Sequence, residues 1–163
     1  MALSKILRPS LDTGVPNVGF AVKKNSDVQT LTNATYTKVT FDTELFDTNN
    51  NFASSRFTPT VAGQYFFYSH LHHYNSASGA TTNRNTVFYK NGAIHTNTLW
   101  AENSTYGYTM KLPASAIIEM NGSSDYLEVY ARAVFSSGTY QIADDTNSGF
   151  QNGNIFFGFR LGV

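Results

Sequence analysis

Apolar and polar residues alternate over short stretches of the chain, and Gly, Asn, Ser and Pro separate these stretches. An alternation with a period of two is typical of half-buried β-strands. β-branched and aromatic residues favour strands, while Asn and Gly favour turns. The pattern predicts an all-β domain. The stretches that carry it are residues 18–22, 36–41, 52–60, 65–68, 86–89, 93–98, 106–112, 115–120, 125–135 and 154–163.

Turn signals join several of these stretches. Asn91-Gly92 follows Lys90 and is a strong type I′ signal, so we expect residues 93–98 to pair back as a hairpin. Asn121-Gly122 marks a second turn. Many short strands with regular turns predict a sandwich or barrel. The polar residues 75–85 predict an exposed, mobile loop.

Composition and charge exclude several classes of function. The 163 residues suit one domain, and the absence of cysteine excludes disulfides and zinc–thiolate sites. Lys and Arg together number 11, as do Asp and Glu, so no basic surface indicates a nucleic-acid partner. No apolar run approaches the roughly 20 residues that span a bilayer, and we expect no membrane insertion.

The first 14 residues predict a separate N-terminal arm, ahead of a domain over residues 15–163. Its apolar residues indicate a docking segment for another protein, with a frayed terminus as the alternative. The start lacks the apolar core of about 7–15 residues that a signal peptide carries, so we do not expect secretion by the usual route. The predicted docking residues are Leu3, Ile6, Leu7 and Leu11.

Motifs in order along residues 15–163 resemble those of the C1q-like domain of the C1q and tumour-necrosis-factor superfamily. The stretch VAGQYFF is similar to the PGLYYF signature of that family, and YLEVY is similar to its VWLQVY strand. No Gly-X-Y collagen repeat accompanies them. The resemblance rests on residues 20–22, 38–41, 44–47, 61–67, 90–92, 115–122, 126–130 and 156–161.

This resemblance implies a ten-strand antiparallel jelly-roll sandwich that assembles as a homotrimer. The aromatic content agrees, because 13 Phe and 10 Tyr exceed the needs of one core. In the aromatic run, period two places Tyr65 and Phe67 on one face and Phe66 and Tyr68 on the other. We expect one face to meet the domain's own core and the other a neighbouring subunit. The residues assigned to this interface and its packing are Tyr65, Phe66, Phe67, Tyr68, His70, Phe157 and Phe159.

Three histidines follow the aromatic run, and three interpretations compete for them. A cupin-type metalloenzyme is disfavoured, because no Asp or Glu occurs between Asp47 and Glu102. His70 and His72 point to the same side of a strand, so three copies could hold a metal on a trimer axis. The favoured interpretation packs His70 in the interface and lets His72 and His73 begin a loop.

One further pair of residues suggests a metal. Asp144 and Asp145 are adjacent carboxylates that could bind calcium, although a solvated turn is the favoured interpretation. We expect no catalytic residues and no cofactor, because no G-x-S-x-G motif or other catalytic constellation is present.

The predicted function is that of a non-enzymatic trimeric virion protein: a phage head fibre, decoration protein or tail-fibre tip. The arm resembles the N-terminal arms of small phage structural proteins and would dock on a capsid or tail protein. The loops at residues 75–85 and 141–152 would contact a host surface glycan or protein. The alternative is a free, extracellular C1q-like ligand or lectin.

Overall fold

The structure is a computed structural model that describes residues 18–25, 28–78, 80–101, 109–143 and 154–161. Every regular element in these ranges is a β-strand, and no helix in them is long and apolar enough to span a membrane. The all-β prediction is therefore confirmed. The predicted arm, with Leu3, Ile6, Leu7 and Leu11, lies outside the described residues.

Two antiparallel sheets form the domain. The first sheet contains β1 (Gly19–Lys23), β2 (Gln29–Thr30), β4 (Thr43–Asp47), β7 (Gly63–Asn75), β10 (Thr109–Met120), β12 (Tyr140–Ile142) and β13 (Ile155–Arg160). The second sheet contains β3 (Thr37–Lys38), β5 (Phe52–Ala53), β6 (Arg56–Phe57), β8 (Thr81–Lys90), β9 (Ala93–Ala101) and β11 (Leu127–Phe135).

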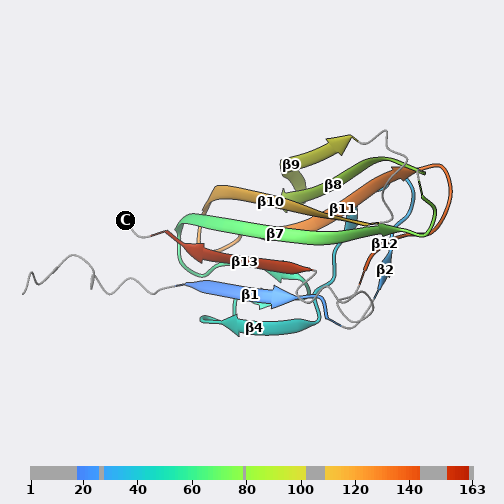
Figure 1. Ribbon diagram of the computed structural model, residues 1–163. Coiled ribbons are helices and arrows are strands. Elements are labelled where there is room, and N and C mark those ends of the chain that lie inside the picture. The colour runs from blue at the N-terminus through green and yellow to red at the C-terminus, as the bar shows by residue number, and fades with distance from the viewer. Residues whose placement is uncertain (1–17, 26–27, 79, 102–108, 144–153, 162–163) are drawn as a thin grey trace, which may run out of the picture.

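Strand β7 organises the first sheet. On one side it pairs with β10 over its whole length, and on the other with β13 and then with β12. Strand β1 joins β13 to β4, so β4, β1, β13, β7 and β10 lie side by side in that order (Figure 1). Non-consecutive strands are thus neighbours, as in a jelly roll.

Aromatic rings fill one end of the space between the sheets. Phe20 of β1 stacks on Phe57 of β6 with ring centroids 4.2 Å apart. Phe156 of β13 meets the edge of Phe20 at 4.8 Å, and Phe67 of β7 packs against Phe88 of β8. All five rings are fully buried. Because they come from both sheets, they fix how the sheets face each other.

The predicted hairpin between β8 and β9 is confirmed. Lys90 pairs with Ala93, and Asn91 and Gly92 between them both have positive φ, at 54° and 81°. Two central residues of this kind define a type I′ turn.

The prediction of a mobile loop over residues 75–85 is wrong. Strand β7 continues to Asn75 and β8 begins at Thr81, and Arg84 and Asn85 are buried. Polar composition was misleading, because the interior at this end of the sandwich is itself polar. The guanidinium of Arg84 lies 5.9 Å from the ring centre of Tyr140.

The two strands predicted around residues 106–120 are a single strand, β10. Pro113 lies within β10, although proline cannot donate a hydrogen bond to a neighbouring strand. Among the described residues β10 pairs only with β7, which makes β10 an edge strand. An edge strand tolerates proline.

Gly158 allows the ring of Phe67 to pack against β13, and its replacement is a test of that packing. A Cβ at Gly158 would lie 2.7 Å from Phe67 Cε1. We expect Gly158→Ala to lower the free energy of unfolding by about 1–3 kcal/mol in urea denaturation, because the core becomes overpacked. Phe67→Leu in the same chain should recover part of this loss. Simple addition of the two losses would contradict the crowding.

Candidate functional site

The outer side of the first sheet carries a contiguous group of apolar side chains, which we call the aromatic face. Its members project away from the core on four strands, β4, β13, β7 and β10, and β1 lies between β4 and β13. The β1 residues opposite Phe159 and Phe157 are Gly19 and Ala21, whose side chains are too small to project beyond the rings. The aromatic face consists of Phe46, Phe66, Tyr68, Ile117, Phe157 and Phe159.

Alternation along β7 creates this face. Tyr65 and Phe67 are fully buried in the core, whereas Phe66 and Tyr68 are half-buried on the outside. The register then brings neighbours beside them. Phe66 has Phe159 of β13 on one side and Ile117 of β10 on the other.

The rings on this face touch one another. Phe66 lies 5.5 Å from Phe159 and 6.4 Å from Phe157 between ring centroids, and Phe157 lies 5.3 Å from Tyr68. At the β10 edge, Ile117 is 58% exposed, and at the β4 edge, Phe46 is 51% exposed. A contiguous exposed apolar patch marks an interaction surface on a soluble protein.

The side chain of Phe46 lies beside Gly19 of β1. Its ring carbon Cε2 is 3.6 Å from the position that a Cβ of residue 19 would occupy. Phe46 and Ile117 were missing from the predicted interface. The sequence carried only a weak signal for either residue, since neither belongs to a long aromatic run.

The structure divides the predicted interface residues into two groups. Phe66, Tyr68, His70, Phe157 and Phe159 lie on the outside of the first sheet, while Tyr65 and Phe67 face inward. Tyr65 donates a hydrogen bond to the carbonyl of Val61 at 2.7 Å. Tyr65 and Phe67 therefore serve core packing, as the period of two required.

The prediction that His72 and His73 begin a loop is wrong. Both lie within β7, and both are buried. The backbone amide of His72 donates to Asn154 Oδ1 at 2.7 Å, which ties this part of β7 to the start of β13. The strand continues because β12 replaces β13 as its neighbour at His73.

His73 lies inside the sandwich between two hydroxyl groups. Its Nδ1 is 3.0 Å from the Tyr140 hydroxyl, and its Nε2 is 3.1 Å from Thr86 Oγ1. The Thr86 hydroxyl donates to the carbonyl of Leu112 at 3.0 Å. Thr86 must therefore accept from His73, which places the imidazole proton on Nε2 and lets Nδ1 accept from Tyr140.

Complete burial, together with the nearby charges of Arg84 and His72, lowers the pKa of His73 to about 3. The folded domain thus holds this histidine neutral. An imidazolium donates from both nitrogens, so the Tyr140 hydroxyl would then have to accept from Nδ1 instead of donating to it.

The metal predictions have different outcomes. Within the described residues, no group of three His, Cys, Asp or Glu side chains could hold a metal ion. Asp144 and Asp145 lie outside those residues. His70 is half-buried on the outer side of β7, with its ring 5.8 Å from that of Tyr68. A metal shared by His70 and His72 of three chains stays a prediction.

Two solved structures that resemble this chain identify its fold. The globular domain of zebrafish complement 1qA protein aligns with 90% of this chain and 98% of its own, at 17% identity and a TM-score of 0.53. Murine APRIL at pH 8.0 aligns with 90% of this chain and 100% of its own, at 8% identity and a TM-score of 0.61. These structural alignments establish the C1q/TNF-like jelly-roll fold, and at such low sequence identity they establish the fold alone.

Two comparisons of the sequence find no match. No protein-family model matches the chain, and no curated protein matches it. The fold predicted from the motifs of residues 15–163 is nevertheless confirmed by the structures that resemble it.

The neutral state of His73 predicts acid sensitivity. As the pH falls from about 6.5 towards 3, the unfolded chain takes up a proton at His73 that the folded chain does not. The contribution of His73 to the free energy of unfolding should therefore fall by about 1.4 kcal/mol for each unit by which the pH drops. We expect His73→Gln to make the free energy of unfolding, measured by urea denaturation, depend less steeply on pH between pH 6 and pH 4.

His95→Gln is the control for this measurement, because His95 is exposed on β9. This variant should keep the slope of the unmodified chain. An unchanged slope in His73→Gln would contradict the assignment of a neutral buried imidazole.

Proposed function

We propose that the chain is a non-enzymatic trimeric head, in which the aromatic face of each subunit is covered by its neighbours. The aromatic face is the observation that carries this proposal. It is broad, it lies on one sheet, and its rings already contact one another within the chain. Covering such a surface supplies the hydrophobic stabilisation of a permanent interface.

The C1q/TNF-like fold supports a trimer as the oligomer, since the resemblance of the sequence to C1q-like domains implies one. In a closed ring of three, every copy gives one patch to one neighbour and a different patch to the other, so the aromatic face of each copy is covered. His70 would then lie at the margin of the buried surface, beside Tyr68.

The finer proposal is a virion protein: a head fibre, a decoration protein or a tail-fibre tip. Its support is the apolar residues of the N-terminal arm, which suit docking on a capsid or tail protein. Three heads held together would multiply a weak contact with a host glycan or protein. A decoration protein would instead stabilise the particle by binding only its assembled form.

A free extracellular ligand is the second candidate. The observation that favours it is the likeness of the fold to a complement globular domain and to APRIL. The two candidates share the trimer and differ in the role of residues 1–14.

The arm distinguishes these candidates. We expect the full chain to sediment with purified particles of the virus that encodes it, and a chain shortened to residues 15–163 to stay in the supernatant. Denaturing gels of the pelleted particles give the readout. Equal retention of both chains would contradict docking by the arm, and a full chain found only in the medium would favour the free ligand.

The aromatic face can be tested separately. Phe159→Glu places a carboxylate among the rings at a residue that is 43% exposed, and it should convert the trimer into monomers in sedimentation velocity. Ile94→Glu is the matched control, because Ile94 is 46% exposed but lies on β9 of the second sheet. Equal sedimentation of both variants would contradict an interface at this face.

A further inference from the structure

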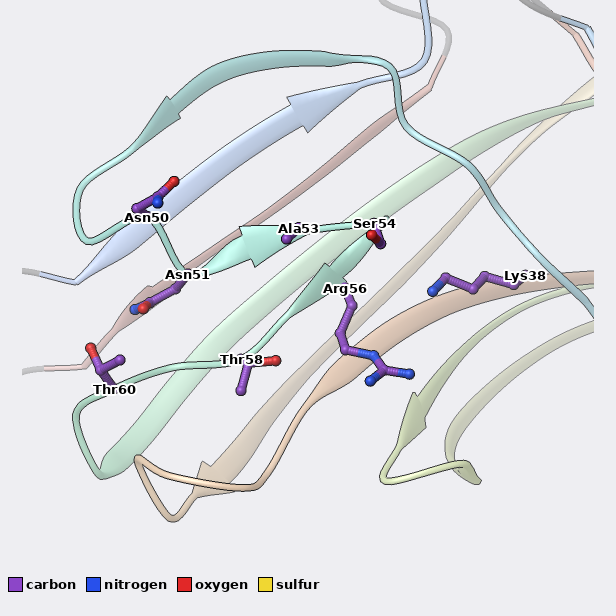
Figure 2. Close-up of a pocket in the computed structure, with 8 residues that line it drawn as sticks. All are labelled: Lys38, Asn50, Asn51, Ala53, Ser54, Arg56, Thr58 and Thr60. Carbon is purple, nitrogen blue, oxygen red and sulfur yellow. The ribbon is translucent and has the colours of Figure 1, made fainter.

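A pocket of about 530 Å³ opens beside the hairpin of β5 and β6, and we call it the hairpin pocket. Its size lies within the roughly 300–1,000 Å³ that small-molecule sites occupy. Figure 2 shows Lys38 and Arg56 toward one end of it and Asn51 and Thr60 toward the other.

Two cations form one end of the pocket. Lys38 Nζ lies 2.7 Å and Arg56 Nε lies 2.9 Å from the same oxygen, Oε1 of Glu128. The guanidinium of Arg56 also lies 3.9 Å from the ring centre of Tyr126, which fixes its plane. In the part of the chain that the structure describes, the Nη1 and Nη2 atoms of Arg56 have no protein acceptor.

Glu128 lies beneath the cations, where a ligand does not meet it. Its side chain is only 4% exposed, whereas those of Lys38 and Arg56 are 30% and 43% exposed. Burial raises the pKa of Glu128, but hydrogen bonds and charge from both cations outweigh this and hold the pKa below its usual value. Two cations over one carboxylate leave a net charge of plus one, and the accessible part of it is positive.

Uncharged polar side chains form the rest of the pocket. Within the described residues, the side chains of Asn50, Ser54, Thr58 and Thr60 make no hydrogen bond, so their hydroxyl and amide groups are open to a ligand. Asn51 Nδ2 is buried and has no acceptor, although buried donors in folded proteins are nearly always paired. The terminal torsion of Asn is soft, so this amide can turn toward a ligand oxygen.

The backbone of the hairpin is strained at the pocket. Ala53 pairs with Arg56, and the two residues between them, Ser54 and Ser55, have φ of 51° and 57°. This turn favours Asn-Gly, and serine is costly there. Ser55 is explained, because its hydroxyl accepts from the amide of Phe41 at 2.9 Å. Ser54 has no such contact, and it lines the pocket. Strain of this kind is typical of binding sites.

We infer that the hairpin pocket binds the carboxylate-bearing sugar residue of an acidic saccharide. The planar fork of Arg56 suits a carboxylate, and Lys38 adds a second charge-assisted hydrogen bond. One net positive charge matches one carboxylate. The amides and hydroxyls at the other end supply the donors and acceptors that sugar hydroxyls require.

This inference goes beyond the proposed trimer, because the pocket lies on the second-sheet side and needs no neighbouring subunit. It also differs from the loops at residues 75–85 and 141–152 that the sequence suggested as contact regions. Failure of the trimer would leave the pocket intact, so the two proposals fail separately.

The test is a titration of the ¹⁵N-labelled full-length chain with glucuronate, followed through its amide signals. Glucose tests the hydroxyls without the charge, and acetate tests the charge without the hydroxyls. We expect glucuronate to bind with millimolar affinity and to shift the amides of Asn51 and Arg56, and both other probes to bind more weakly. Arg56→Gln should weaken glucuronate by about tenfold or more.

Variants at Thr60 keep the test decisive if Arg56→Gln unfolds the hairpin. Thr60 is exposed and lines the pocket away from Glu128. Thr60→Glu should abolish glucuronate binding, because the new carboxylate repels that of the ligand. Thr60→Gln should preserve binding, because glutamine has the shape of glutamate without its charge. Lys90→Gln breaks a different ion pair, with Asp125, and should change nothing.

Several results would overturn the inference. Glucuronate could leave the pocket amides unshifted at tens of millimolar, or acetate or glucose could bind as tightly as glucuronate. Equal affinity in Thr60→Glu and Thr60→Gln would also overturn it, because the charge would then be irrelevant.

Discussion

A single constraint shapes this domain: strand β7 is apolar on both of its faces, and both must be covered. Its inward side chains, Tyr65, Phe67 and Leu71, meet the second sheet and are fully buried. Its outward side chains include Phe66 and Tyr68, which lie beside residues of β13 and β10. Because the period of a strand is two, the four consecutive aromatic residues of β7 place two rings on each face of the sheet. The aromatic face follows from the unbroken run of aromatic residues in this strand.

The two sheets are thereby given different roles. The first sheet presents rings to the outside, while the second sheet presents ion pairs and tyrosines. On β11, Glu128 holds Lys38 and Arg56, and Tyr130 stacks on Tyr89 with ring centroids 3.9 Å apart. Ion pairs with exposed partners remain compatible with water, so this side suits a small polar ligand. A subunit neighbour on one sheet and a solvent-facing pocket on the other can coexist in the same assembly.

The sequence was most informative where a local rule fixes the structure. Asn91-Gly92 fixed a turn, and alternation fixed which residues of the aromatic run share a face. Neither rule could decide which face of a strand packs in the core and which meets a partner, because that depends on which strands become neighbours in the sheet. Phe46 shows this limit, since it joins the face only through the pairing of β4 with β1.

Polar residues inside the sandwich escaped sequence reasoning for a related cause. Burial of Arg84 and His73 depends on partners such as Tyr140 and Thr86, which are distant in the chain. Polarity alone predicted exposure for both segments. The hairpin pocket was missed in the same way, because Lys38, Arg56 and Glu128 are brought together only by the pairing of β3 and β6 with β11.

The claim that the aromatic face is a covered subunit interface is tested most directly by the molar mass of the unmodified full-length chain in solution. Light scattering across a range of concentrations, with and without a chelator, gives that mass. The account predicts the mass of three chains at every concentration, unchanged by the chelator. A stable mass of one chain would contradict it, because the aromatic face would then be exposed to water.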